Sequence, residues 1–134
     1  MRMLAAVQDC KTILVVDDEP AIRESLGDLL REEGYEVLEA QNGAEALVRL
    51  REPAQHPPCV IILDLMMPVM DGYEFRAEQL RDAALADIPV VVVSADGNVR
   101  RKTASMQVAA ALAKPLQLNV FVAEIERHCK TAAA

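Results

Sequence analysis

Cysteine is scarce in this sequence, and the few cysteines form no recognisable group. Cys10, Cys59 and Cys129 are far apart, and no C-x-x-C motif is present. Zinc sites and disulfide frameworks depend on paired or regularly spaced cysteines. The sequence therefore indicates neither kind of site, and we expect Cys59 and Cys129 to be residues of the hydrophobic core.

Long apolar runs are missing as well. The chain is 52% hydrophobic, yet none of its runs approaches the roughly 20 apolar residues that a membrane-spanning helix needs. The opening stretch MRMLAAVQDC holds one arginine and a brief apolar patch. A signal peptide needs a longer apolar stretch and a small-residue cleavage site. We therefore expect a cytoplasmic protein with no membrane insertion.

Basic residues are outnumbered by acidic ones. The chain has 14 Lys and Arg against 21 Asp and Glu, for a net charge of −7. Direct binding of nucleic acid needs a basic face that neutralises phosphates, so we do not expect it. The nucleotide-binding motifs G-x-G-x-x-G and G-x-x-x-x-G-K-[ST] are also absent. The charge instead suits a protein that meets basic or cationic partners.

β-branched runs alternate with amphipathic stretches along the chain. The predicted strands are 12–16, 35–40, 59–63 and 88–93, and the predicted helices are 20–34, 42–52, a stretch after Asp71, 97–106 and 117–129. The segment 108–113 is ambiguous because alanine prefers helix. Alternating strands and helices form βαβ units around a parallel sheet. We expect one α/β domain with a doubly wound sheet and its most apolar strands in the centre.

The last predicted helix has a regular apolar pattern. Leu118, Val122, Ile125 and Cys129 recur at helical spacing. Residues with this spacing share one face of a helix. We therefore expect all four side chains on the buried face.

Polar residues follow the buried strands at their carboxyl ends. Asp17 and Asp18 follow the first strand, Asp64 the third and Ser94 the fourth, and Lys114 follows the ambiguous segment. Ligands of a doubly wound sheet bind at this edge, where the strand order reverses. One such residue alone is usually a helix N-cap or a turn residue. Their joint occurrence favours a functional site.

Crowded carboxylates at this edge need a positive charge nearby, because each raises the pKa of its neighbours. Lys114 supplies one charge, and Mg²⁺ would supply more, since it prefers carboxylate and carbonyl oxygens. No histidine or cysteine lies near this edge of the predicted sheet, so iron and zinc are poor candidates. A magnesium ion, a lysine, a hydroxyl and a carboxylate together suggest phosphoryl transfer to an aspartate.

Four stretches resemble the receiver domain of bacterial response regulators. They are VVDDEP at 15–20, LDLMMPVMDG at 63–72, VVVSA at 91–95 and AKP at 113–115. The resemblance covers about 12–129, which makes 1–11 an N-terminal extension and 130–134 a short tail. It implies a flavodoxin-like (βα)5 fold with five parallel strands in the order 2-1-3-4-5.

The resemblance also implies a role for each residue of the predicted site. Asp64 would accept the phosphoryl group, and Ser94 and Lys114 would bind phosphoryl oxygens. The Mg²⁺ ligands would all be oxygen atoms, from Asp17, Asp18, Asp64 and the backbone carbonyl of Met66. The resemblance further allows a cis peptide bond between Lys114 and Pro115, as in relatives.

The implied function is that of a stand-alone response regulator in two-component signalling. It would receive its phosphoryl group from a sensor histidine kinase or a phosphotransfer protein and signal through contacts with a downstream protein. It would not be an enzyme, although it would assist its own phosphorylation and dephosphorylation. One alternative is a receiver-fold interaction module that phosphorylation does not regulate. An aspartate-nucleophile phosphatase is set aside, because Met66 stands where its D-x-D motif needs an acid.

One position departs from the family pattern. Receivers commonly carry Tyr or Phe three residues before the motif lysine, and this ring moves when the Ser or Thr moves toward the phosphate. Ala111 stands there in this chain. Two interpretations stay open: switching is weak or uses backbone shifts and another surface, or Ala111 is simply a small strand residue. Met66 and Asp96 match positions that tune phosphate lifetime, and we expect intermediate to slow hydrolysis.

Overall fold

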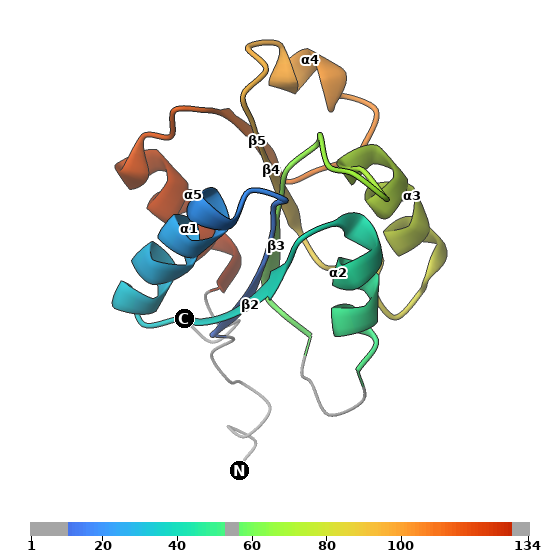
Figure 1. Ribbon diagram of the computed structural model, residues 1–134, viewed down its shortest axis with the longest axis horizontal. Coiled ribbons are helices and arrows are strands. Elements are labelled where there is room, and N and C mark those ends of the chain that lie inside the picture. The colour runs from blue at the N-terminus through green and yellow to red at the C-terminus, as the bar shows by residue number, and fades with distance from the viewer. Residues whose placement is uncertain (1–10, 53–56, 130–134) are drawn as a thin grey trace.

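Strands and helices alternate along the whole described chain (Figure 1), which in this computed structural model comprises residues 11–52 and 57–129. The strands are β1 (Thr12–Val16), β2 (Glu36–Ala40), β3 (Val60–Leu63), β4 (Val90–Ser94) and β5 (Ala110–Ala113). The helices are α1 (Pro20–Glu32), α2 (Gly43–Leu50), α3 (Gly72–Arg81), α4 (Val99–Lys102) and α5 (Leu118–Cys129). The expected N-terminal extension, apart from Lys11, and the expected tail lie outside the described residues.

The five strands form one parallel sheet in the order β2-β1-β3-β4-β5, which confirms the predicted fold. Strand order reverses between β1 and β3. In that pair Val16 lies opposite Leu63, so the residues that follow both strands leave the sheet at the same level. The central strands β1, β3 and β4 are almost wholly buried, as their apolar runs predict.

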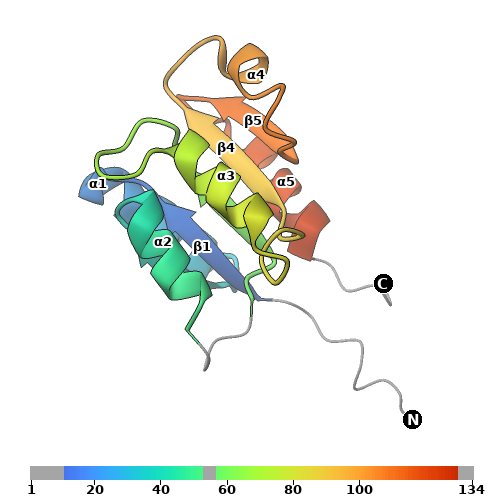
Figure 2. The ribbon, with the colours of Figure 1, turned by 90° about the vertical axis from the view of Figure 1, so that its right-hand side faces the viewer.

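Helices cover both faces of the sheet. Helices α1 and α5 lie on one face and α2, α3 and α4 on the other (Figure 1), and the rotated view shows α2 and α3 in front of the strands (Figure 2). Alternate residues of each strand point to opposite faces. Leu14 packs in a cluster with Phe75 of α3, whereas Ile13 packs in a cluster with Phe121 of α5. The sheet therefore separates two apolar cores.

Local sequence signals begin and end several helices. Pro20 occupies the first turn of α1, and Gly34, with a φ of +97°, follows the end of that helix. Asn42 caps α2 by accepting a hydrogen bond from the backbone N–H of Glu45 at 2.9 Å. Asp71 caps α3 in a reciprocal capping box. These short polar side chains satisfy backbone donors that the first helical turn leaves unpaired.

Two helical predictions need correction. Helix α4 spans only Val99–Lys102 instead of 97–106, because the chain turns after Lys102 and reaches a positive φ at Gln107. In α5, Leu118 does not lie on the buried face as predicted: it is 56% exposed, whereas Phe121 is fully buried.

The ambiguous alanine-rich segment is strand β5, since its backbone pairs with β4. Pairing with a formed sheet outweighs the helix preference of alanine.

The cysteine prediction also needs correction. Cys59, just before β3, and Cys129, the last residue of α5, form a disulfide with a Cα–Cα distance of 5.4 Å. Cys129 is buried, as expected for a core residue. The two positions are 70 residues apart, so spacing along the chain could not reveal the pair. No helix in the described ranges has the length and apolar character to cross a membrane.

Candidate functional site

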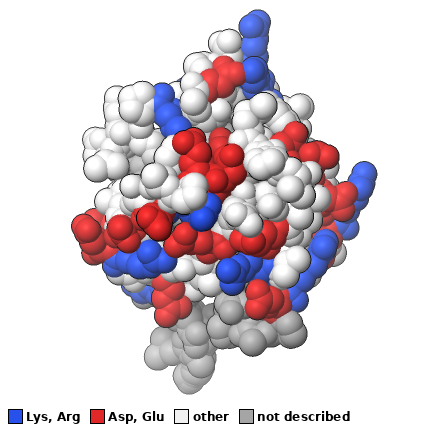
Figure 3. All heavy atoms as spheres, in the orientation of Figure 1, with Lys and Arg blue, Asp and Glu red and all other residues white. Residues whose placement is uncertain are grey.

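Three carboxylates meet where the strand order reverses. Asp17 and Asp18 follow β1 and Asp64 follows β3, and one carboxylate oxygen from each lies within 4.8 Å of the others. The backbone N–H of Asp64 donates to the carbonyl of Val16 at 3.0 Å, which joins the two strand ends. Figure 3 shows acidic side chains gathered on this face of the molecule, with lysine and arginine side chains around them. The structure thus brings the predicted acids together.

Lys114 and Ser94 come to the same edge from the neighbouring strands. The Nζ atom of Lys114 lies 3.4 Å from Oδ2 of Asp17. The backbone N–H of Lys114 donates to the carbonyl of Ser94 at 2.8 Å, which aligns the ends of β4 and β5. Ser94 is 2% exposed. The Lys114–Pro115 peptide bond is cis, as the resemblance allows.

Burial and charge together raise the pKa of Asp64 from its ordinary value of 3.8 to about 6. Loss of hydration is the largest cause, because burial disfavours the charged carboxylate. The charge of Asp17 acts in the same direction, and that of Asp18 adds less. Lys114 and a hydrogen bond from the backbone N–H of Met66 lower this pKa. The site therefore has an excess of negative charge that a cation would offset.

The donor set fits a hard divalent cation. Its members are three carboxylates, and within the described ranges neither histidine nor cysteine belongs to the cluster. Oxygen-only sites of this kind suit Mg²⁺, which keeps several waters and takes one or two carboxylates. The backbone N–H of Met66 donates a hydrogen bond to Asp64, and the side chain of Met66 is exposed. Its carbonyl as a metal ligand stays a prediction.

The loop from β3 to α3 is packed tightly against Asp64. The N–H of Gly72 donates to the carbonyl of Leu65 at 2.9 Å. A Cβ on Gly72 would lie 2.6 Å from the backbone oxygen of Asp64 and 2.9 Å from Cα of Leu65. Backbone atoms cannot move aside as the end of a side chain can. The glycine therefore lets α3 begin directly beside the site.

We expect Gly72→Ala to destabilise the protein by about 2 kcal/mol, because inserting a methyl into a filled space forces the backbone to shift. Urea unfolding measures this change. Gly97→Ala is the matched control, since a Cβ there meets nothing within 4 Å, and it should stay within about 0.5 kcal/mol of the wild type. Equal unfolding midpoints for Gly72→Ala and the wild type would contradict the close packing.

Asp96, which is predicted to tune phosphate lifetime, is paired with a neighbouring lysine. Its carboxylate forms an ion pair with Lys102 of α4 and accepts a hydrogen bond from the N–H of Asn98. The hydrogen bond from Lys102 is the largest cause of its lowered pKa. The backbone N–H of Asp96 donates to the hydroxyl of Ser94 at 3.2 Å. Asp96 is thus linked both to the site and to α4.

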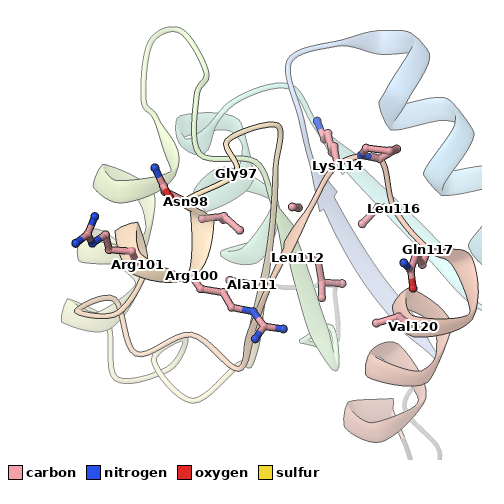
Figure 4. Close-up of a pocket in the computed structure, with 13 residues that line it drawn as sticks. Gly97, Asn98, Arg100, Arg101, Ala111, Leu112, Lys114, Leu116, Gln117 and Val120 are labelled. Atoms are coloured by element: carbon pink, nitrogen blue, oxygen red, sulfur yellow. The ribbon is translucent and has the colours of Figure 1, made fainter.

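The position that lacks the aromatic ring lines a groove beside the site. A groove of about 630 Å³ runs between α4 and α5, and Ala111 forms part of its floor. Figure 4 shows Arg100 reaching toward β5 from the α4 side, Val120 on the α5 side and Lys114 near one end. Whether Ala111 changes the switching of this protein stays a prediction.

Arg23 is a residue near the site that the sequence did not reveal. Its Nη1 donates to the backbone carbonyl of Asp17 at 2.6 Å. It lies within α1, and no strand ends at its position. An arginine inside an amphipathic helix is usually a solvated residue, so no feature of the sequence marks Arg23 as part of the site.

Comparison with known proteins decides the family. The family model of the response regulator receiver domain matches residues 13–126. The chain belongs to this family. Members of this family are phosphoacceptors of two-component signalling.

Several named proteins are similar to this receiver. The phosphate regulon transcriptional regulatory protein PhoB of Pseudomonas aeruginosa is 36% identical over 118 residues, which cover 87% of this chain and 50% of PhoB. Response regulator MprA of Mycobacterium sp. strain KMS is 40% identical over 115 residues, which cover 84% of this chain and 48% of MprA. The chain thus spans about half the length of these curated relatives.

Solved structures show the same fold. Response regulator TrrA of Thermotoga maritima, solved in complex with Mg²⁺ and BeF, is 32% identical with a TM-score of 0.74, over 87% of this chain and 97% of TrrA. A receiver protein from Pseudomonas putida has a TM-score of 0.81 at 26% identity, over 90% of this chain and 99% of that chain. These matches agree with the parallel sheet described above.

Proposed function

We propose that this receiver accepts a phosphoryl group on Asp64 in a Mg²⁺-dependent reaction. The donor would be a sensor histidine kinase or a phosphotransfer protein. The observation that carries the proposal is the meeting of Asp17, Asp18 and Asp64 within 4.8 Å, with Lys114 3.4 Å from Asp17. A receiver fold with this donor set has the parts that phosphoryl transfer to a carboxylate requires.

The chemistry follows from the positions of these groups. A carboxylate oxygen of Asp64 attacks phosphorus in line with the leaving group, which departs with the electron pair of its bond, and an acyl phosphate forms. Bound Mg²⁺, held by Asp17, Asp18, Asp64 and the carbonyl of Met66, would neutralise charge on the transferring group. Lys114 and Ser94 would bind phosphoryl oxygens, the lysine through its charge and the serine through its hydroxyl.

Asp64 must be ionised to act as the nucleophile. Its pKa of about 6 in the metal-free site means that neighbouring positive charge favours the reactive form. Lys114 and the Met66 N–H already act in that direction. The same groups would assist hydrolysis of the acyl phosphate, so the protein would influence its own phosphorylation and dephosphorylation.

We further propose that the output passes through protein contacts of the receiver, which comprises 12–129. Phosphorylation adds negative charge beside Lys114 and Ser94, and a downstream protein would recognise the resulting change of surface. A cytoplasmic location and a stand-alone form are part of this proposal, without direct nucleic-acid binding or membrane insertion. The stand-alone form is tested by isolating the protein from the cells that produce it and measuring its intact mass.

The decisive experiment is phosphorylation by acetyl phosphate with Mg²⁺, followed by intact-mass measurement. We expect a gain of one phosphate in the wild type, none in Asp64→Ala, and none when EDTA removes the metal. Asp28→Ala is the matched control, because Asp28 is an exposed acid on α1, and it should gain phosphate as the wild type does.

Two results would contradict the proposal. A phosphate gain in Asp64→Ala would move the acceptor to another residue. No gain from acetyl phosphate or from a histidine kinase would instead favour the alternative, a receiver-fold interaction module that phosphorylation does not regulate.

A further inference from the structure

Arg23 links three segments around the acidic cluster. It belongs to α1, and its side chain is 17% exposed. Its Nη1 donates to the backbone carbonyl of Asp17 at 2.6 Å, and its Nε donates to Oε1 of Glu39 on β2 at 3.2 Å. One guanidinium therefore connects the helix, the loop after β1 and the neighbouring strand. The planar fork of arginine is suited to hold two such partners at once.

The carbonyl that Arg23 holds belongs to the peptide unit between Asp17 and Asp18. A peptide unit is planar, so fixing its oxygen also fixes the N and Cα atoms of the next residue. On the other side, the N–H of Asp17 donates to the carbonyl of Ala40 at 3.1 Å. The Arg23 contact thus sets the direction in which the side chain of Asp18 leaves the backbone.

The carboxylate of Asp17 has its own restraints. One oxygen accepts a hydrogen bond from the N–H of Glu19 at 2.9 Å, and the other lies 3.4 Å from Nζ of Lys114. Among residues 11–52 and 57–129, no hydrogen bond restrains the side chain of Asp18, which is partly exposed. Its orientation therefore depends more on the backbone that carries it.

Glu39 compensates the positive charge of the Arg23 guanidinium by forming an ion pair with it. It pairs with Arg23 and also with Arg31, whose Nη2 lies 3.0 Å from its second oxygen. Arg23 thus acts on the cluster through geometry.

We propose that Arg23 is a positioning residue of the cation site, which orients the Asp17–Asp18 peptide so that both carboxylates converge with that of Asp64. The inference rests on the proposed function, because it concerns the same magnesium site. It adds a residue that touches neither the cation nor the phosphoryl group. Residues of this kind orient the groups that do touch the metal.

Arg31 provides a matched control. It binds the same carboxylate, Glu39, but it lies two turns further along α1 and its side chain is 46% exposed. Both Arg23→Gln and Arg31→Gln remove one positive charge and one partner of Glu39. Only Arg23→Gln removes the hydrogen bond to the Asp17 carbonyl.

The test is a titration with Mg²⁺ alone. The NMR amide signals of Asp17, Asp18 and Asp64 monitor binding during the titration. We expect Arg23→Gln to weaken Mg²⁺ binding about tenfold, as loss of a group that orients metal ligands typically does. Arg31→Gln should bind within about twofold of the wild type, since exposed ion pairs have small effects. Urea unfolding of the metal-free variants separates a loss of affinity from a loss of folded protein.

The outcomes distinguish this inference from the proposed function. If the wild type binds no Mg²⁺, both are wrong. If the wild type and Arg23→Gln bind Mg²⁺ equally, or if Arg31→Gln loses as much affinity as Arg23→Gln, only the role of Arg23 is overturned. Should Arg23→Gln not fold, Arg23→Lys replaces it, because one ammonium cannot reproduce the two-pronged contact. Wild-type affinity in that variant overturns the role as well.

Discussion

Replacing Asp64 by asparagine is expected to stabilise the metal-free protein by about 3 kcal/mol at pH 8. Asp64 is 9% exposed, and its carboxylate lies beside those of Asp17 and Asp18. Its ionised form is therefore poorly hydrated and repelled by its neighbours. Asparagine keeps nearly the same shape and can still accept the hydrogen bond from the Met66 N–H, but it carries no charge.

The sign of the pH dependence follows from the pKa of Asp64. Folding raises it from 3.8 to about 6, so between these values the folded protein binds more protons at this site than the unfolded chain does. Stability therefore falls as pH rises through this window. Below about pH 4 both states are protonated and the penalty is absent, whereas above about pH 6 it is fully present.

Urea unfolding in EDTA, from pH 3.5 to pH 8, measures this difference. The stability of Asp64→Asn minus that of the wild type should be near zero at low pH and grow to about 3 kcal/mol at high pH. Asp28→Asn is the control, because Asp28 is exposed, and it should change stability by less than about 0.5 kcal/mol. Adding Mg²⁺ should stabilise the wild type more than Asp64→Asn. A less stable Asp64→Asn at pH 8 without metal would contradict this picture.

Replacing Arg76 by alanine is expected to cost about 3 kcal/mol of stability, because it leaves two buried acceptors and one partly buried acceptor without this donor. Arg76 lies on α3 and is 6% exposed. It donates to the carbonyls of Met106 and Gln107 at 2.9 and 2.6 Å and to Oε1 of Gln79 at 2.7 Å. Burial lowers its pKa, and within the described ranges no carboxylate forms a salt bridge with it.

These bonds attach α3 to the loop between α4 and β5. Gln107 has a φ of +57°, a conformation that is rare for a residue with a side chain, and the bond from Arg76 to its carbonyl helps to hold it there. Gln79 extends the network by donating to the carbonyls of Leu85 and Ile88. Loss of Arg76 should therefore loosen the loop before β5 as well as lower global stability.

The matched control is Arg81→Ala on the same helix. Arg81 has a 75% exposed side chain and pairs with Glu78, and exposed pairs of this kind contribute less than about 1 kcal/mol. Urea unfolding compares the two variants, and hydrogen exchange of residues 103–109 reports on the loop. If Arg76→Ala and Arg81→Ala were equally stable, the buried hydrogen bonds would have no net effect.

Strands β1, β3 and β4 could be predicted because each is an apolar run that needs burial on both faces. The residues of the acidic cluster could be predicted because each directly follows a strand, and parallel strands place those ends at one edge. Helix α4 was predicted too long, since the polarity of 97–106 suits a turn as well as a helix. The exposure of Leu118 was missed because spacing indicates a shared face but not which face the sheet covers.

The sequence by itself determined the order of elements, the parallel sheet and the residues at its carboxyl edge, because these depend on patterns within a few neighbouring residues. Only the tertiary structure decided that the alanine-rich segment is strand β5, that Cys59 pairs with Cys129, and that Arg23 and Arg76 hold distant loops. Each of these contacts joins segments that meet only after the sheet has formed. A side chain in a helix carries no local sign of which backbone carbonyl will lie beside it.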